Sequence, residues 1–263
     1  MRAATGELNA VRAAGLLVRY AVMGDGAIVI VELPKHGSKG TQLEEPCVLE
    51  HWGIVMSGSV RLDGAGHHTY GPGSAFYVKP GPPAHRFEAD GPAVLAGFAP
   101  LTVPINDSRA AFRARGITPV REPSVVAKLP ATVHLDRARS ASVGEIQTQS
   151  VTMGDYLFTV TTYGRLSGYT DDWCDLPHWG MVLDGDLILR FEGAEMELLG
   201  AGDAFYCPSG PPGHLIEVAD AAAIVDYTPL AALDDPARRR ALRTLAARPP
   251  RRARASRRPN AHL

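Results

Sequence analysis

The chain contains an internal repeat that carries cysteine and histidine at matching places. His51-Trp-Gly-Ile-Val-Met-Ser-Gly58 returns as His178-Trp-Gly-Met-Val-Leu-Asp-Gly185. A second block, from Gly73 to His85, returns from Gly202 to His214 with the same Ala-Phe-Tyr and Pro-Pro elements. Because two copies are too few for a solenoid, this repeat predicts two similar domains in tandem.

The repeat also sets the expected domain boundaries. We expect an N-terminal domain over 17–104, a linker over 105–144, a C-terminal domain over 145–229, and a helix with an Arg-rich tail over 230–263. Each copy is long enough to close a core of its own. Short helices are predicted at 108–115 and 230–247 from their caps and apolar spacing.

The secondary structure within each copy is predicted to be strand. The segments 26–32 and 156–162 are rich in β-branched and aromatic residues, and Gly- and Pro-rich turns separate the short runs. Many short strands with such turns are typical of an all-β sandwich or barrel, of which a jelly roll is one form.

The amino-acid composition indicates the cellular compartment in which the protein is expected. It is 45% hydrophobic and 21% charged, and it has neither an apolar run long enough to span a membrane nor a secretory leader pattern. Cysteines at equivalent places of two repeats favour reduced thiols over a disulfide framework. We therefore expect a cytoplasmic protein without membrane contact.

Charge is distributed unevenly along the chain. Residues 237–263 contain ten Arg and no Asp or Glu, so the formal net charge of −1 leaves about −11 for the rest. A basic tail can touch nucleic acid, but this one has no aromatic side chain for base stacking. We therefore favour a solvated tail that does not bind nucleic acid. For the protein as a whole, we expect the binding partner to be a small-molecule ligand or substrate. A homodimer stays open as an alternative.

The spacing around the first repeated histidine predicts a metal site. On a strand, alternate residues share a face, so Glu45, Cys47 and His51 would point the same way. His85 follows a Pro-rich turn and could arrive from a neighbouring strand. A carboxylate, a thiolate and two imidazoles form a plausible ligand set for a divalent ion, with Glu45 the least certain member.

The second repeat predicts the same site with one carboxylate changed. Asp172, Cys174 and His178 would share a face, and His214 would join them. The alternative is that the cysteines are small buried residues, as free cysteines often are. Cys207 has no cysteine partner in the first copy, so we expect it in the core.

With these residues and spacings, the chain resembles members of the cupin superfamily, and specifically a bicupin, which has two cupin domains in tandem. Cupins carry a first motif, G-x5-H-x-H-x3,4-E-x6-G, and a second, G-x5-P-x-G-x2-H-x3-N. The spacing of both motifs is matched in each repeat, over about two thirds of the chain, but the residues at the motif positions differ. Carboxylates stand at the place of the first histidine, cysteines at the second, histidines at the glutamate, and the final Asn is missing: Glu45 and Asp172, Cys47 and Cys174, His51 and His178, Ala89 and Val218.

The resemblance implies small jelly-roll barrels that bind metal, and it leaves the reaction open. Thiolate beside imidazole favours zinc, with iron or nickel as alternatives. The favoured function is a metal-dependent small-molecule enzyme with redox-neutral chemistry of the isomerase, cyclase, lyase or hydrolase type. The alternatives are a non-catalytic metal- or effector-binding cupin, or an iron-dependent dioxygenase. No catalytic residue is assigned beyond the ligands.

The two copies are not equivalent, and this predicts a division of labour. Glu45 is one methylene longer than Asp172, and Pro80 and Pro208 stand at different distances from their histidines. We expect one site to be tight and closed and the other to be open to ligand, without assigning which.

Residues beside the histidines have expected structural roles. Trp52 and Trp179 follow the histidines and should point to the opposite face, where they would pack between sheets or domains. Gly53 and Gly180 share the ligand face, where they would leave room in the barrel or simply allow a bend.

Overall fold

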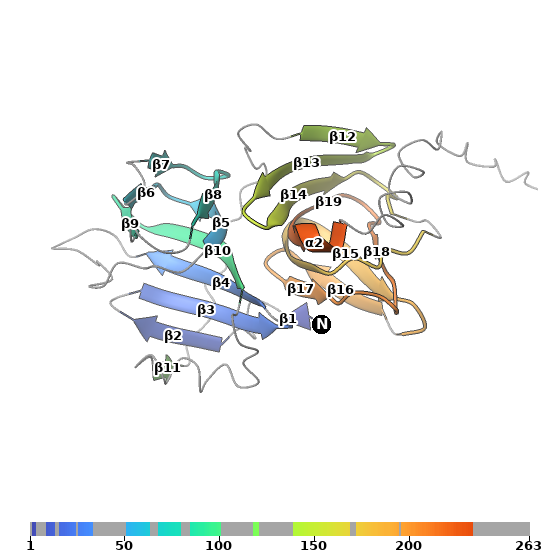
Figure 1. Ribbon diagram of the computed structural model, residues 1–263, viewed down its shortest axis with the longest axis horizontal. Helices are drawn as coiled ribbons and strands as arrows, with labels where there is room; N and C mark the ends of the chain where they lie inside the picture. Colours follow the sequence, from blue (N-terminus) through green and yellow to red (C-terminus); the bar gives the residue numbers. More distant parts are fainter. Residues whose placement is uncertain are drawn as a thin grey trace, which may run out of the picture.

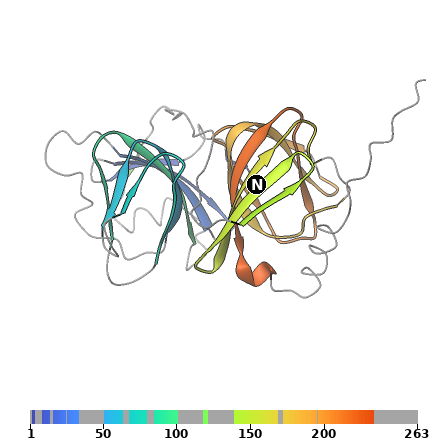
Figure 2. The same ribbon diagram turned by 90° about the horizontal axis from the view of Figure 1, so that it is seen from above.

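The computed structural model describes residues 2–3, 9–13, 16–24, 26–33, 51–63, 68–79, 85–100, 118–120, 139–168, 172–194 and 196–233. These residues form two β-barrels that lie side by side, as Figures 1 and 2 show from two directions. The prediction of two all-β jelly-roll domains in tandem is therefore confirmed.

The first barrel is built from two antiparallel sheets. Its larger sheet has the order β11-β2-β3-β4-β10-β5-β8 and its smaller one the order β7-β6-β9. The strand bounds are β2 Asn9–Ala13, β3 Leu16–Met23, β4 Gly26–Leu33, β5 His51–Ser57, β6 Val60–Asp63, β7 His68–Tyr70, β8 Ala75–Val78, β9 Arg86–Ala89, β10 Ala93–Pro100 and β11 Thr118–Val120.

The second barrel repeats this plan with one long strand in place of two. Its main path is β1-β17-β15-β19-β14-β13-β12, and β16 and β18 pair with β15. The bounds are β1 Arg2–Ala3, β12 Arg139–Val143, β13 Ile146–Met153, β14 Tyr156–Tyr163, β15 His178–Phe191, β16 Met196–Gly200, β17 Ala204–Cys207, β18 His214–Glu217 and β19 Ala222–Pro229, followed by α2 Leu230–Leu233.

Strand registers show that the two barrels are copies. Leu33 pairs with Ala93 across β4 and β10, and Tyr163 pairs with Ala222 across β14 and β19. Val18 pairs with Val31 just as Thr148 pairs with Thr161. Each position of one barrel therefore has a definite counterpart in the other.

A shared aromatic core joins the barrels. Trp52 donates its Nε1 proton to the Met153 carbonyl oxygen at 2.7 Å, and Trp179 donates its Nε1 proton to the Met23 carbonyl oxygen at 2.7 Å. Phe98 lies between the two indoles, with ring centroids 5.7 Å and 5.1 Å away. The prediction that the tryptophans pack between domains is confirmed.

Each barrel also has an apolar interior of its own. Gly53 faces the ring of Phe76 and Gly180 faces the ring of Phe205, and a Cβ at either glycine would lie 2.3 Å from the ring Cζ. Each glycine therefore leaves space in its barrel, and in each case that space is occupied by a phenylalanine ring. Cys207 is fully buried in the second interior, as expected of a core residue.

Four strands extend the sheets beyond the predicted domains 17–104 and 145–229, namely β1, β2, β11 and β12. β11 and β12 lie within the expected linker 105–144, yet β11 pairs with β2 and β12 with β13. β1 pairs with β17 and covers that edge of the second barrel (Figure 1). These outer strands have no repeated motif, so the boundaries expected from the repeat omit them.

The helix expected at 108–115 lies outside the described residues. The one expected over 230–247 is described as far as Leu233, in α2, and the Arg-rich tail lies beyond it. Within the described part of the chain, no helix has the length and apolar character needed to cross a membrane.

Candidate metal centre

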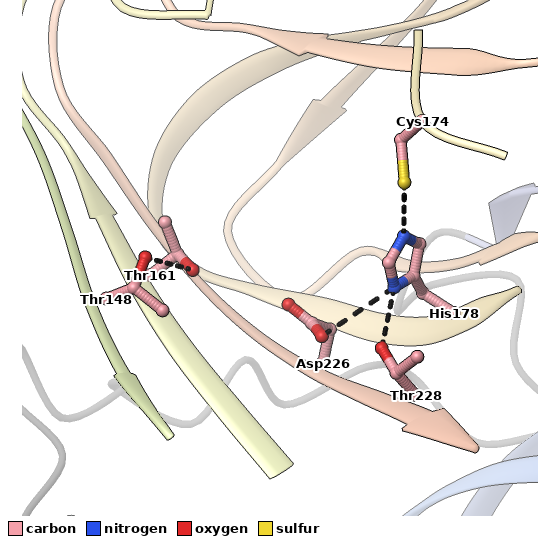
Figure 3. Close-up of polar contacts among 6 residues, drawn as sticks. All are labelled: Thr148, Thr161, Cys174, His178, Asp226 and Thr228. Carbon is pink, nitrogen blue, oxygen red and sulfur yellow. Dashed lines mark hydrogen bonds and ion pairs between the residues drawn. The ribbon is translucent and has the colours of Figure 1, made fainter. Parts of the chain in front are cut away.

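The second barrel brings three of the expected ligands together. One ligand atom each from Cys174, His178 and His214 lies within 4.8 Å of the others. The Cys174 sulfur is 3.2 Å from Nε2 of His178, and the two imidazole rings meet edge to face at 4.9 Å. Figure 3 shows the cysteine directed at the histidine.

Local backbone pairing explains this convergence. His178 begins β15, whose ladder with β17 holds it in place. Cys174 forms an isolated antiparallel bridge with His214, with reciprocal backbone hydrogen bonds of 2.8 Å. The segment 172–177 is thus not the continuous strand assumed from the sequence.

Asp172 does not take part in the group. It is exposed, and the three-residue cluster does not include it. Because the chain before Cys174 is not a regular strand, the alternation that would put Asp172 on the ligand face does not operate there. Its proposed ligation is not supported by this geometry.

The other nitrogen of His178 is held by β19. Nδ1 of His178 lies 2.8 Å from the Thr228 hydroxyl and 3.9 Å from Oδ1 of Asp226 (Figure 3). The threonine contact is a hydrogen bond, whereas the aspartate lies beyond hydrogen-bond distance. Together they orient the ring so that Nε2 faces the cysteine, in the manner of outer partners of metal-binding histidines.

Burial keeps the imidazoles neutral. It lowers the pKa of His178 to about 3, with His214 adding to the effect. It lowers the pKa of His214 to about 4, against an opposing influence of Asp175. Neutral imidazoles have a lone pair for a metal, so the site is ready to bind at neutral pH.

Burial acts in the opposite direction on the nearby carboxyl. It raises the pKa of Asp226 to about 7. A cation bound at the Nε2 side of His178 would favour the ionised form of Asp226 again.

The donor set fits a divalent metal ion. Tetrahedral zinc with sulfur and nitrogen ligands needs donor atoms about 3.3–3.6 Å apart, and the observed sulfur–nitrogen distance of 3.2 Å is close to this. Nδ1 of His214 is buried without a hydrogen-bond partner among the described residues. A buried group of this kind calls for a partner, and a metal would supply one if it bound there.

The first barrel shows half of its expected site. His51 and His85 meet edge to face with ring centroids 5.2 Å apart. Burial lowers the pKa of His51 to about 4, and it lowers the pKa of His85 as well. Cys47 and Glu45 lie outside the described residues, so their ligation stays a prediction.

Sequence reasoning missed the two residues that support His178. Asp226 and Thr228 stand where the first repeat has Gly97 and Ala99, in the same register of the final strand. In the sequence, Gly97-Phe-Ala-Pro100 and Asp226-Tyr-Thr-Pro229 stand at equivalent places near the end of each copy. Without the fold, nothing linked these positions to the histidines.

Comparisons with known proteins identify the fold. No protein-family model and no curated protein matches the chain. Among solved structures it is similar to AerE from Microcystis aeruginosa, with a TM-score of 0.57 and 12% identity over 82% of this chain and 92% of that one. It is also similar to a mutant of oxalate decarboxylase from Bacillus subtilis, with a TM-score of 0.62 and 12% identity over 87% of this chain and 77% of that one.

Another structure of the Bacillus subtilis enzyme, from work on its Mn(II) centres, matches at 13% identity. At such identities the likeness shows the fold alone. The alignments span both repeats, and both repeats close into barrels of matching strand order. The chain therefore has the bicupin fold, with a Cys/His variant of the first cupin motif in each repeat.

Proposed function

We propose that this chain is a metal-dependent cupin enzyme that acts on a small molecule, with its reactive centre in the second barrel. The observation that carries the proposal is the group formed by Cys174, His178 and His214. Structural zinc sites are closed by four protein ligands, whereas catalytic ones have three and leave a position for water or substrate.

Accessibility supports a reactive rather than a structural role. The side chain of His178 is 18% exposed and Cys174 is only partly buried, so the centre is reachable from solvent. His214 is only 2% exposed and anchors the group from within the barrel. A site with one buried and one accessible side can hold an ion and still admit a ligand.

The residues have separable roles in this proposal. Cys174 and the two histidines would hold the ion, and Thr228 would fix the ring of His178 through its Nδ1 hydrogen bond. Zinc is the ion that a thiolate with two imidazoles favours, with iron and nickel as alternatives. When bound, zinc supplies Lewis acidity for redox-neutral chemistry of the isomerase, cyclase, lyase or hydrolase type.

Cobalt substitution tests the centre directly. In a Cys47→Ala background, Co²⁺-loaded protein should show a thiolate-to-cobalt absorption band that comes from Cys174 alone. Cys174→Ala should abolish the band and lower the metal content by one ion per chain. Cys207→Ala is the matched control, because this cysteine is buried in the core and should leave the band intact. A band that survives Cys174→Ala would contradict the proposal.

A further inference from the structure

The inner side of the second barrel has a polar surface next to the candidate metal centre. On β14, Phe158 and Val160 pack in the core between the barrels. Thr159 and Thr161 therefore point the other way, into the barrel, where Tyr163 packs against the interior. The polar wall, as we call it, consists of inward side chains from β13, β14 and β19: Thr148, Thr159, Thr161, Tyr163, Asp226 and Thr228.

The first barrel has apolar residues at every one of these positions. The matching registers of β3, β4 and β10 give the counterparts directly. In the order of the polar wall, they are Val18, Val29, Val31, Leu33, Gly97 and Ala99. The first barrel therefore closes without these six polar groups, and the hydroxyl on this face belongs to Tyr20 of β3, which pairs with Val29.

Burying the polar groups of the wall inside the barrel lowers the stability of the fold. Thr159, Thr161 and Asp226 are 9%, 6% and 9% exposed. A threonine and a valine have nearly the same shape, so a buried hydroxyl contributes little to packing that valine would not. Six polar residues on one face, three of them threonines at positions where the sister barrel has valine, indicate a use other than stability.

The wall is continuous with the metal group. Asp226 lies 3.9 Å from Nδ1 of His178, and the hydroxyls of Thr148 and Thr161 lie 3.4 Å from each other. Figure 3 shows the threonine pair, Asp226 and His178 following one another across the strands. Burial raises the pKa of Tyr163, so its hydroxyl stays a proton donor at neutral pH.

The charge of the wall restricts what it can bind. Asp226 is its one ionisable acid, and β13, β14 and β19 contain no Lys or Arg. Apart from the metal itself, a carboxylate ligand would meet no cationic side chain from these strands, so the part of it that lies on the wall would lose its hydration without compensation. A neutral molecule with several hydroxyl groups can instead exchange hydrogen bonds with threonine hydroxyls and donate to Asp226.

We infer that the polar wall is the substrate-binding surface of the second barrel, and that its ligand is a small, uncharged, hydroxyl-bearing molecule. The inference rests on the proposed function, because it places this ligand beside the metal of that centre. It assigns the first barrel no such ligand, since its equivalent surface is apolar.

Titration of a neutral polyol and of oxalate tests the ligand class. The probes are D-sorbitol and oxalate, titrated separately into the full chain after removal of metal and followed by calorimetry, because oxalate chelates Co²⁺ and would bind a loaded centre through the ion. We expect sorbitol to bind at the second barrel and oxalate to bind at least about tenfold more weakly there. Equal or tighter binding of oxalate, or no binding of sorbitol, would overturn the inference.

A double variant tests the location of the ligand. Thr159→Val with Thr161→Val recreates Val29 and Val31 of the first barrel and keeps the side-chain shape. Loss of two hydrogen bonds should weaken sorbitol binding about tenfold or more. Thr162→Val is the control, because Thr162 lies on the same strand but is exposed on the opposite face. Equal sorbitol affinity in wild type and the double variant would overturn the location.

The two proposals fail in different ways. Absence of the thiolate-to-cobalt band in the wild type would remove the proposed metal function. A normal band in the Cys47→Ala protein and in the threonine variants, together with unchanged sorbitol affinity in the threonine double variant, would leave the metal centre standing and remove only the polar wall as its binding surface.

Discussion

Single residues set the protonation state of the second barrel. His178 and His214 are buried beside each other, and burial lowers the pKa of both. The same burial raises the pKa of Asp226. Burial therefore favours the neutral forms of both the two histidines and Asp226. In such a site the main charge would come from a bound cation.

The lowered histidine pKa values predict a pH-dependent stability of the metal-free protein. An unfolded histidine titrates near 6.5, whereas these two titrate at about 3 and about 4 when folded. At these two residues the unfolded state therefore binds more protons below pH 6.5, so their contribution to stability falls as the pH falls toward 4, while Asp226, with its raised folded pKa, contributes in the opposite direction. At pH 5 we expect a loss on the order of 2 kcal/mol per histidine relative to pH 7.5.

Urea unfolding of chelator-treated protein at the two pH values measures this loss. His214→Gln should retain a smaller part of the pH dependence, because glutamine has no proton to gain. His68→Gln, at an exposed position, should behave like the wild type. A pH dependence that is unchanged in His214→Gln would rule out this residue as a source.

At the scale of elements, β15 and β19 present different chemistry on their two faces. Trp179 and Met181 of β15 point to the core between the barrels, while His178 and Gly180 face the barrel interior. On β19, Val225 joins the same shared core. In a strand that is buried on both faces, one face can thus pack in the core between the barrels while the other presents side chains for binding in the barrel interior.

The close approach of β15 and β17 predicts the effect of adding one methyl group. A Cβ at Gly180 would lie 2.3 Å from Cζ of Phe205, so Gly180→Ala must displace a buried ring. We expect a loss of about 1–3 kcal/mol in the free energy of unfolding, measured by chemical denaturation. Gly91→Ala is the matched control, since a Cβ there meets nothing within 4 Å. Equal stability of the two variants would contradict the packing.

At the scale of the whole molecule, the barrels share one core and exchange hydrogen bonds. Each repeated tryptophan donates to a carbonyl of the other barrel. Phe98, from the first barrel, packs on Trp179 and Tyr227 of the second. Neither barrel can therefore open this face without exposing apolar surface of both.

This shared core predicts that the barrels unfold together. Trp52→Phe leaves the Met153 carbonyl without its indole donor, and should cost about 1–2 kcal/mol. In a Trp173→Phe background, Trp179 is then the remaining tryptophan, and it reports on the second barrel and on its contact with Met23 and Phe98 of the first. Its fluorescence midpoint should shift although the substitution lies in the first barrel, and Trp179→Phe should shift the Trp52 signal in the same way. Separate midpoints for the two reporters would contradict a single cooperative unit.

The sequence by itself determined those features that are written within a repeat. Two copies of one motif predicted two barrels, and strand alternation predicted which side of β15 each of His178 and Trp179 would face. The spacing also selected Cys174, His178 and His214 as a group. Its one error of geometry, the strand over 172–178, arose because a backbone bridge with His214 replaced regular pairing there.

Only the tertiary structure decided which barrel has the richer site. Thr228 is 50 residues from His178 in the chain, and β19 brings it within 2.8 Å. Asp226 and the threonines of β14 look unremarkable in sequence, because hydroxyl-bearing and β-branched residues are common in any strand. Barrel closure turns their faces toward one interior, and this is the physical reason why the polar wall could be recognised only once the strands were paired.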